Sequence, residues 1–346
     1  MGLKLSISKI TLFVLFAATF TGCESVRYYT QAVGGQVSIL NKRQSINRLL
    51  ADLQLPTKQK NQFRRIMDIR EFAKKELNLP VNNHYLTFVE LNRPYVLWNV
   101  YAAPEFDFAP KTWCYPIVGC TAYRGYFSKK NARRYADQLN QEGFDVYVGG
   151  VTAYSTLGWF DDPIYSTFID FSEARLAALI FHELAHQIVY VKDDTTFNES
   201  FATAVEQEGL RRWMESRGKA AAYRNYLRAY ERRFRFNQLI LEYRKKLESL
   251  YEKNMPIEEK RREKEYVIYR LKDEYYKLKQ HWNGYAGYDP WFRNPINNAQ
   301  INTVSIYNDM VPAFLQLIEQ NGGDLSLFYE TCQKLARYSK KERIRR

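Results

Sequence analysis

The sequence predicts an α+β protein, in which a small antiparallel or mixed sheet packs against helices and a long charged helical hairpin is attached to this core. Strand-like and helical segments alternate over residues 47–170. An almost wholly apolar helical segment, typical of a buried helix, follows at residues 176–191. Residues 211–282 are rich in Lys, Arg and Glu, with apolar residues at three- and four-residue steps, which predicts two amphipathic helices.

The segments before the apolar helix predict the following elements. Residues 47–76 are helical, with Leu53 on the apolar face. Residues 85–90 and 95–101 are two strands joined by a turn at Asn92–Pro94. Ser128 caps a helix that ends at Gly143, and residues 144–148 return as a strand.

The first residues predict export. Lys4 and Lys9 precede a short apolar stretch that ends in Phe20-Thr21-Gly22-Cys23, which is too short to span a bilayer and reads as a secretory signal over residues 1–22. Its end resembles a bacterial lipobox, with cleavage before Cys23 and a diacylglycerol on the sulfur; an ordinary signal peptide is the alternative. The expected location is the envelope of a Gram-negative bacterium, anchored to the membrane and facing the periplasm. Glu24 favours the outer membrane.

The rest of the chain divides by composition. Residues 23–45 are an anchor and linker, and residues 46–210 are the α+β core. Residues 211–283 are the charged hairpin, which is broken at Asn254-Met255-Pro256. Residues 284–346 return to globular character, with an apolar helix from Ile301, and complete the core.

Cysteine usage agrees with export. Cys114 and Cys120 flank a turn-rich pentapeptide, and we expect a disulfide between them in an oxidising compartment. Cys332 is expected to be a buried apolar residue.

The segment His182-Glu183-Leu184-Ala185-His186 lies within the apolar helical run. Two histidines four residues apart share one helix face and can bind one metal ion, and Glu183 can act as a general base toward a water molecule. Burying these groups without partners would cost several kcal/mol. A hydrogen-bonded core cluster is the alternative to a zinc site. Asp170 is expected to cap this helix, with Glu173 completing a capping box.

A third ligand is expected from the next helix. Asn198 is expected to cap that helix and to place Glu199 in its first turn. Three protein ligands leave a fourth position open, as in catalytic zinc sites. Glu206, two turns further along the same face, is the rival third ligand.

The segments HELAHQ, from His182, and NESFA, from Asn198, resemble the gluzincin peptidases and especially their aminopeptidase N branch. Most of the chain also resembles a family of bacterial lipoproteins described as putative aminopeptidases. Shared features are the lipobox, the cysteine pair, the zinc motif, residues 154–163 and Asn297-Asn298-Ala299 before Pro312. The resemblance implies a gluzincin-like core, peptide substrates and one Zn²⁺ per chain. In that reading His182, His186 and Glu199 are ligands and Glu183 is the base.

The chain departs from aminopeptidase N in two respects. Twelve residues separate His186 from Glu199, which is a shorter gap, and the G-A-M-E-N segment that binds the substrate amine there has no counterpart. Asp161 and Asp162 are candidates for binding a substrate ammonium; a turn of solvated acids before Pro163 is the alternative.

Stabilising the oxyanion of peptide hydrolysis requires a hydrogen-bond donor. Tyr307, Tyr288 and Tyr190 are the candidates, in that order, and an ordinary core tyrosine is the alternative for each.

The competing functional class is a non-catalytic lipoprotein scaffold that keeps a peptidase fold and uses the hairpin as its binding surface. The chain has an excess of basic residues and a net charge of +13. This positive charge could attract anionic lipid or a protein partner to the hairpin. Nucleic acid is not expected as a partner, because no recognition motif occurs in an exported chain.

Overall fold

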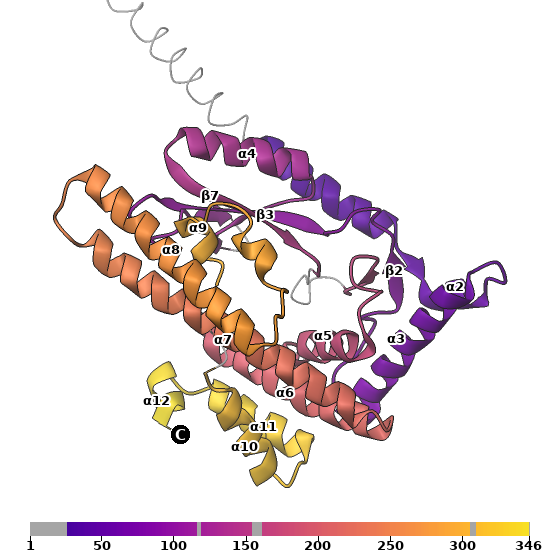
Figure 1. Ribbon diagram of the computed structural model, residues 1–346. Helices are drawn as coiled ribbons and strands as arrows, with labels where there is room; N and C mark the ends of the chain where they lie inside the picture. The colour runs from indigo at the N-terminus through magenta and orange to yellow at the C-terminus, as the bar shows by residue number, and fades with distance from the viewer. Residues whose placement is uncertain (1–25, 116–118, 154–160, 305–308, 346) are drawn as a thin grey trace, which may run out of the picture.

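The computed structural model describes residues 26–115, 119–153, 161–304 and 309–345 as a mixture of helices and short strands (Figure 1). The strands are β1 (Gln44–Ser45), β2 (Thr87–Val89), β3 (Leu97–Pro104), β4 (Trp113–Tyr115), β5 (Gly119–Thr121), β6 (Arg124–Tyr126), β7 (Phe144–Val151) and β8 (Ile164–Tyr165). The helices are the N-terminal helix (residues 26–41), α2 (Ile46–Ala51), α3 (Thr57–Lys75), α4 (Lys129–Gln141), α5 (Glu173–Ala185), α6 (Thr195–Ser216), α7 (Ala220–Tyr251), α8 (Ile257–His281), the 3-10 helix η1 (Asp289–Phe292), α9 (Asn298–Ile301), α10 (Val311–Gln320), α11 (Leu325–Ala336) and α12 (Lys340–Arg345).

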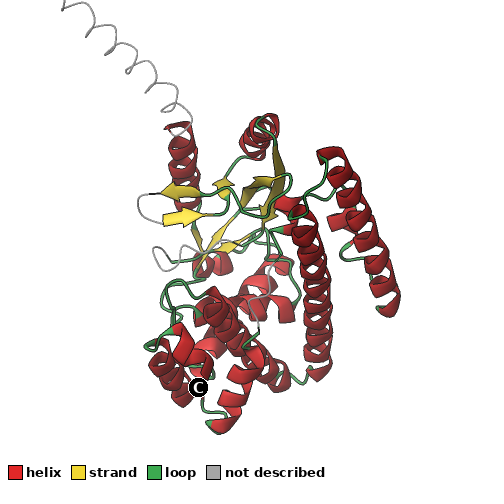
Figure 2. Cartoon of the chain, turned by 90° about the vertical axis from the view of Figure 1, so that its left-hand side faces the viewer, coloured by secondary structure: helices red, strands yellow, loops and turns green. Residues whose placement is uncertain are grey.

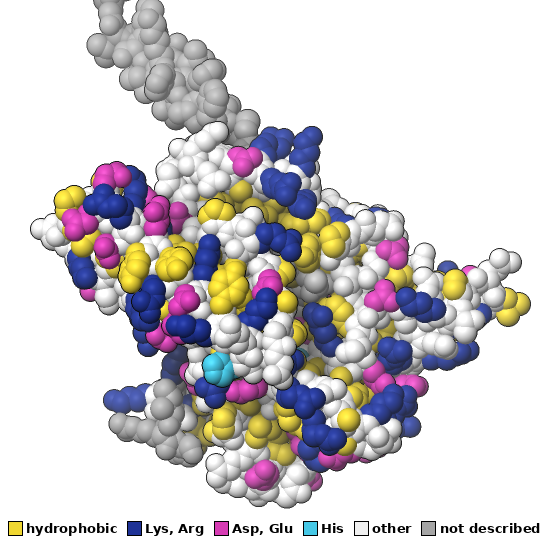
Figure 3. Space-filling model, in the orientation of Figure 1, with side chains coloured by type: hydrophobic (Ala, Val, Ile, Leu, Met, Phe, Trp, Pro, Cys, Tyr) yellow, Lys and Arg dark blue, Asp and Glu magenta, His cyan; other side chains and the backbone are white. Residues whose placement is uncertain are grey.

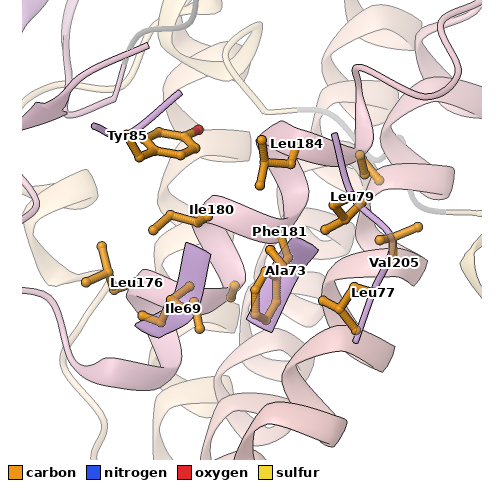
Figure 4. Close-up of a cluster of buried hydrophobic side chains, with 14 of the residues drawn as sticks. Ile69, Ala73, Leu77, Leu79, Tyr85, Leu176, Ile180, Phe181, Leu184 and Val205 are labelled. Atoms are coloured by element: carbon orange, nitrogen blue, oxygen red, sulfur yellow. The ribbon is translucent and has the colours of Figure 1, made fainter. Parts of the chain in front are cut away.

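The largest hydrophobic cluster surrounds α5. Figure 4 shows apolar side chains of α3, α5 and α6 meeting here, with Ile180, Phe181 and Leu184 of α5 facing the end of α3 and the loop after it. A three-stranded sheet in the order β1-β2-β8 borders this cluster, with β1 antiparallel and β8 parallel to β2. Helices α10 and α11 add residues on the far side of α6. The helix α5 is therefore buried along most of its length.

The close approach of α5 and α6 depends on Gly209. A Cβ at this position would lie 2.7 Å from Cδ1 of Leu77 and 3.0 Å from Cδ2 of Phe181, so a larger residue would force these neighbours to move. Helices pack closest where a small residue lets the two backbones approach. The two helices run side by side in Figure 1, and Glu199 and Glu206 of α6 reach His182 at the end of α5.

A second sheet, in the order β6-β3-β7, lies above this cluster in Figure 1. One face is covered by α4 and the N-terminal helix: Tyr28 of the N-terminal helix packs with Tyr126 of β6, and Tyr126 packs with Tyr135 of α4. The opposite face carries Asp145, which bonds to Lys264 of α8 (2.9 Å) and to the backbone N–H of Asn298 (3.0 Å). Helices therefore contact both faces of the sheet.

The charged segment forms the expected antiparallel hairpin of α7 and α8, and α8 begins directly after Pro256 (Figure 2). The hairpin buries its own hydrophobic cluster, in which Phe236 of α7 stacks on Tyr288 with ring centroids 4.2 Å apart. Lys264, which is only 8% exposed, ties α8 to the second sheet. The hairpin is thus packed onto the core rather than extended away from it.

The two strands expected around Asn92 occur as β2 and β3, which belong to different sheets. Three other local expectations from the sequence are wrong. Residues 47–76 form two helices separated at Pro56, and Leu53 between them is 93% exposed. Residues 26–41, expected to be linker, are helical. The apolar helix expected from Ile301 is instead the end of α9.

Cys114 of β4 and Cys120 of β5 lie opposite each other and form a disulfide. Cys332 of α11 is a buried free thiol. Within the described ranges, no helix is both long and apolar enough to cross a bilayer. The members of the three hydrophobic clusters all come from residue 28 or later, so a chain that begins at residue 24 retains them.

The C-terminal helix α12 is joined to the start of α6 by a buried ion pair. Arg343 and Asp194 are 8% and 5% exposed, and their side chains are 2.6 Å apart. We expect Arg343→Met to lower the free energy of unfolding by about 3 kcal/mol, because it leaves the Asp194 carboxylate buried without its main partner. Urea denaturation of the chain from residue 24 measures this change.

Arg235→Met is the matched control, because its ion pair with Glu231 is exposed and contributes about 0.5 kcal/mol or less. Equal stability of the two variants would contradict a structural role for the pair between Arg343 and Asp194.

Candidate metal centre

The helix α5 places the two histidines at its C-terminal end. Ser172, and not the expected Asp170, caps this helix, and its hydroxyl accepts the backbone N–H of Arg175. Asp170 lies outside the helix and instead accepts a hydrogen bond from Gln62. His182 lies in the last turn and His186 is the C-cap residue, so the helix ends sooner than the apolar run in the sequence suggested.

The start of α6 also differs from expectation. Asp194 caps the helix by accepting the backbone N–H of Phe197, so that Glu199 lies in the second turn. Asn198 lies within the helix, and its side-chain amide bonds to both the N–H and the C=O of Val191 at 2.8 Å. This pair of bonds closes the short loop between the two helices. The twelve-residue connection therefore brings Glu199 back to the end of α5.

His182, His186 and Glu199 converge on one point. The two Nε2 atoms are 3.2 Å apart, and the Glu199 carboxylate oxygens lie 3.3 Å from Nε2 of His182 and 3.6 Å from Nε2 of His186. Two ligand atoms bound to the same tetrahedral zinc ion at ~2.0–2.1 Å lie ~3.3 Å from each other. The three donors fit a metal ion of this size, and each is partly accessible.

The surrounding charges favour a cation at this point. Burial lowers the pKa of His182, but hydrogen bonds to Glu199 and Glu206 outweigh it and raise that pKa to about 10. Burial and the neighbouring His182 lower the pKa of His186 to about 4. The two carboxylates therefore stabilise one positive charge among these side chains, which is the charge preference of a metal-binding site.

Glu206 lies on the outer side of His182: it bonds to the ring nitrogen that points away from the three candidate ligand atoms, and we call it the outer partner of His182. Its Oε2 lies 2.8 Å from Nδ1 of His182, on the side of the ring away from His186 and Glu199. Its other oxygen accepts the hydroxyl of Tyr226 from α7. Burial and the charge of Glu206 raise the pKa of Tyr226 well above its usual range, so this hydroxyl remains a donor. A carboxylate behind a ligand histidine fixes the ring's orientation and tautomer.

Glu183 faces a different set of residues. It lines a cavity of about 20 Å³, enough for one water molecule. Burial raises the pKa of Glu183, and the carboxylates of Asp162, Glu199 and Glu206 raise it further, against the opposing effect of His182. The cavity is also lined by Tyr85, Ala153, Asp162, Pro163, Tyr165, Phe168 and Leu179.

Asp162 and Tyr85 are held together in the wall of this cavity. The backbone N–H of Tyr85 donates to the carbonyl of Asp162 (2.7 Å), and the N–H of Asp162 donates to Nδ1 of His84 (3.0 Å). Tyr85 adopts a left-handed backbone with φ 63°, which is uncommon for a bulky residue. Burial and the charge of Glu183 raise the pKa of Tyr85 well above its usual range, so its hydroxyl stays protonated beside Glu183.

The other candidate site residues from the sequence lie in different parts of the structure. Asp162 is 5% exposed beside Glu183, whereas the carbonyl of Asp161 accepts a bond from Arg43 at an exposed position. Tyr288 packs in the hairpin cluster and Tyr190 is 61% exposed. Cys23 and Tyr307 lie outside the described residues.

Tyr85, His84 and Tyr226 were not found from the sequence. His84 and Tyr85 lie about 100 residues before the His182–His186 motif, and Tyr226 lies about 40 residues after it. Nothing in the sequence around these three residues marks them as part of a site. The left-handed backbone of Tyr85 has no sequence signal of the kind that Gly or Asn would give.

The structure is that of an α+β protein in which the facing ends of two packed helices bring together His182, His186 and Glu199, a group that could hold a metal ion. The chain belongs to the family described as "Putative aminopeptidase", whose model matches residues 27–346. This match confirms the resemblance to the putative aminopeptidases noted from the sequence. No curated protein and no solved structure matches the chain.

The role of the outer partners can be measured through metal affinity. We expect Glu206→Gln to weaken metal binding ~10–100-fold, because a neutral amide polarises and orients His182 less well than a carboxylate does. Tyr226→Phe should weaken binding less, by up to ~10-fold, since Glu206 itself remains. Competition with a chelating dye measures both values.

Tyr223→Phe is the matched control, because Tyr223 lies one turn earlier on α7, is also partly buried and lacks a bond to Glu206. If Glu206→Gln binds metal as tightly as the parent chain, Glu206 does not act as the outer partner of His182.

Proposed function

We propose that this protein is a zinc-dependent peptidase, and that it removes N-terminal residues from peptides. The observation that carries the proposal is the convergence of His182, His186 and Glu199, with Glu183 next to the first ligand on the same helix. The family description supports peptidase activity.

Zinc fits these residues, because two imidazoles and one carboxylate are common ligands of catalytic zinc and leave a fourth position open. When bound, zinc polarises the scissile carbonyl and makes a water molecule more acidic. The protein's own acid–base group is the Glu183 carboxylate, which takes a proton from the attacking water and passes it to the leaving amine. A raised pKa suits this role, because the group must both accept and release a proton near neutral pH.

We propose that the free amino group of a substrate binds beside Glu183 and Asp162, in the wall of the cavity that both residues line. Asp162 lines the same cavity as Glu183, and its charge is one of those that raise the pKa of Glu183. A substrate ammonium at this wall would be attracted by both carboxylates. Of the two acids before Pro163, we therefore assign the amine to the buried Asp162 and not to the exposed Asp161.

We further propose that the protein works in the cell envelope, anchored by a lipid on Cys23 and facing the periplasm. The signal-like residues 1–22 and the lipobox-like end support this proposal. The disulfide between Cys114 and Cys120 is also typical of an oxidising compartment. Peptides of the periplasm are the substrates that such a location provides.

The base is tested with Glu183→Gln in the chain from residue 24. We expect this variant to retain zinc, because Glu183 is not a ligand, and to lose at least ~100-fold in kcat/KM. Hydrolysis of unblocked fluorogenic peptides and metal analysis are measured on the same preparation. Full activity in this variant would remove Glu183 as the base, and a folded chain that is inactive with every peptide would favour a scaffold.

The amine site is tested by a pair of neighbouring substitutions. Asp162→Asn should raise KM for peptides with a free amino end about 10-fold or more, because it removes one of the two charges that attract the ammonium. It should leave unchanged the much slower cleavage of N-acetylated peptides, which have no ammonium group to bind. Asp161→Asn, one residue away and exposed, should change neither. Equal loss on free and acetylated peptides would contradict amine recognition by Asp162.

A further inference from the structure

The N-terminal helix, residues 26–41, has an exposed face that lacks the usual charges of a solvated helix. Val26, Tyr29, Val33 and Val37 recur at steps of three and four residues, and are 65%, 43%, 62% and 46% exposed. This spacing places them in one stripe along the helix, ~16 Å long at 1.5 Å per residue. Gly34 beside the stripe has open space where a side chain would lie.

The opposite face of the helix is firmly packed. The ring of Tyr28 lies 5.6 Å from that of Tyr126, and Ile39 is 1% exposed. Gln31 donates to the carbonyl of Gly125 and accepts the backbone N–H of Phe127, so both hydrogen bonds fix the helix to strand β6 and the residue after it. The helix therefore cannot rotate its apolar stripe inward, and the stripe remains on the outside of the folded protein.

Basic residues stand at both ends of the N-terminal helix and on its neighbour α4. Residues 26–43 contain Arg27, Lys42 and Arg43 and no acidic residue. Helix α4 covers the same sheet face, and the guanidinium of Arg124 lies over the rings of both Tyr28 and Tyr135, so the two helices are neighbours. The first two turns of α4 expose three further cations, Lys129, Lys130 and Arg133.

The pictures agree with this arrangement. Figure 3 shows Lys and Arg side chains gathered at the top of the molecule, over one end of the place that α4 occupies in Figure 1. In Figure 2 the N-terminal helix stands at the upper left edge, and the α7–α8 hairpin lies toward the other side. Asp145, which binds the hairpin residue Lys264, is on the sheet face opposite α4.

We propose that the outer face of the N-terminal helix lies in the headgroup region of an anionic bilayer, with the cations of α4 contacting the lipid phosphates. An apolar stripe flanked by Lys and Arg is the pattern of a helix that lies in the membrane interface. Tyrosine at such a stripe is also suited to the boundary between lipid and water.

The position of the stripe in the chain favours a bilayer over a second copy of the protein. Cys23, the proposed acylation site, is three residues before Val26, and three residues span at most ~11 Å. A lipid on Cys23 would therefore bring the start of the stripe to the membrane surface. The helix would add to the lipid anchor an attraction to the membrane that does not need acylation.

This surface is tested without the acyl chains. The chain from residue 24 is mixed at low ionic strength with vesicles of phosphatidylethanolamine and phosphatidylglycerol, or of neutral phosphatidylcholine, and binding is measured by flotation. We expect binding to the anionic vesicles, weakened at least ~10-fold by Val33→Glu with Val37→Glu. Lys129→Gln, Lys130→Gln and Arg133→Gln together should abolish the preference for anionic vesicles.

Leu53→Glu is the matched control, because Leu53 is an apolar residue that is 93% exposed outside the stripe and should be replaceable without effect. Circular dichroism and thermal unfolding check that each variant folds.

Absence of binding by the parent chain would overturn the proposal, and so would equal binding by the stripe variant and the Leu53 control. A parent chain that dimerises in sedimentation, ignores vesicles and becomes monomeric through the two glutamates would assign the stripe to a contact between copies instead.

Discussion

The candidate centre depends on the close packing of α5 against α6. Both histidines come from the end of one helix and Glu199 from the second turn of the other, so the three donors meet only if the helix axes approach closely. Gly209 permits this approach, since a side chain there would collide with Leu77 and Phe181. The apolar residues around the two helices supply the stabilisation that holds polar groups at this depth.

The distant parts of the chain hold this pair of helices in place. Arg343 of the last helix bonds to the cap of α6, and the first turns of α7 bring Tyr226 to Glu206. The hairpin therefore contributes a side chain that acts on His182 through Glu206, and is physically part of the centre. A long charged segment that looks like a spacer in the sequence thus has one end in the core of the site.

Local patterns predicted the parts of the structure that local interactions determine. The helix that carries His182 and His186, the Ser128 cap and the break at Pro256 each depend on residues within a few positions of one another. Each of the three is present in the structure. The pairing of β2 and β3 with different strands depends on contacts between distant segments, which the turn-like residues around Asn92 do not encode. The cap of α6 was assigned to Asn198 because its type suits a cap, but Asp194 is nearer the turn and is supported by Arg343.

The same limit applies to the site. The proximity of His182 and His186 follows from their spacing on one helix, whereas Tyr85 and Tyr226 are brought to Glu183 and Glu206 only by tertiary packing. Glu206 was visible as a rival ligand because it shares a helix face with Glu199, and only the orientation of the His182 ring assigns it to the outer position. The N-terminal helix was overlooked because a signal-like segment and a lipobox suggested a linker after them.

The metal content of the purified chain from residue 24, measured by elemental analysis beside Glu199→Gln, decides whether His182, His186 and Glu199 form a zinc site. We expect one zinc per chain in the parent and a clear loss of zinc in the variant, which should stay folded because Glu199 is partly exposed at the helix surface. A folded parent chain that takes up no zinc or other divalent metal, even when the metal is supplied, would rule this site out.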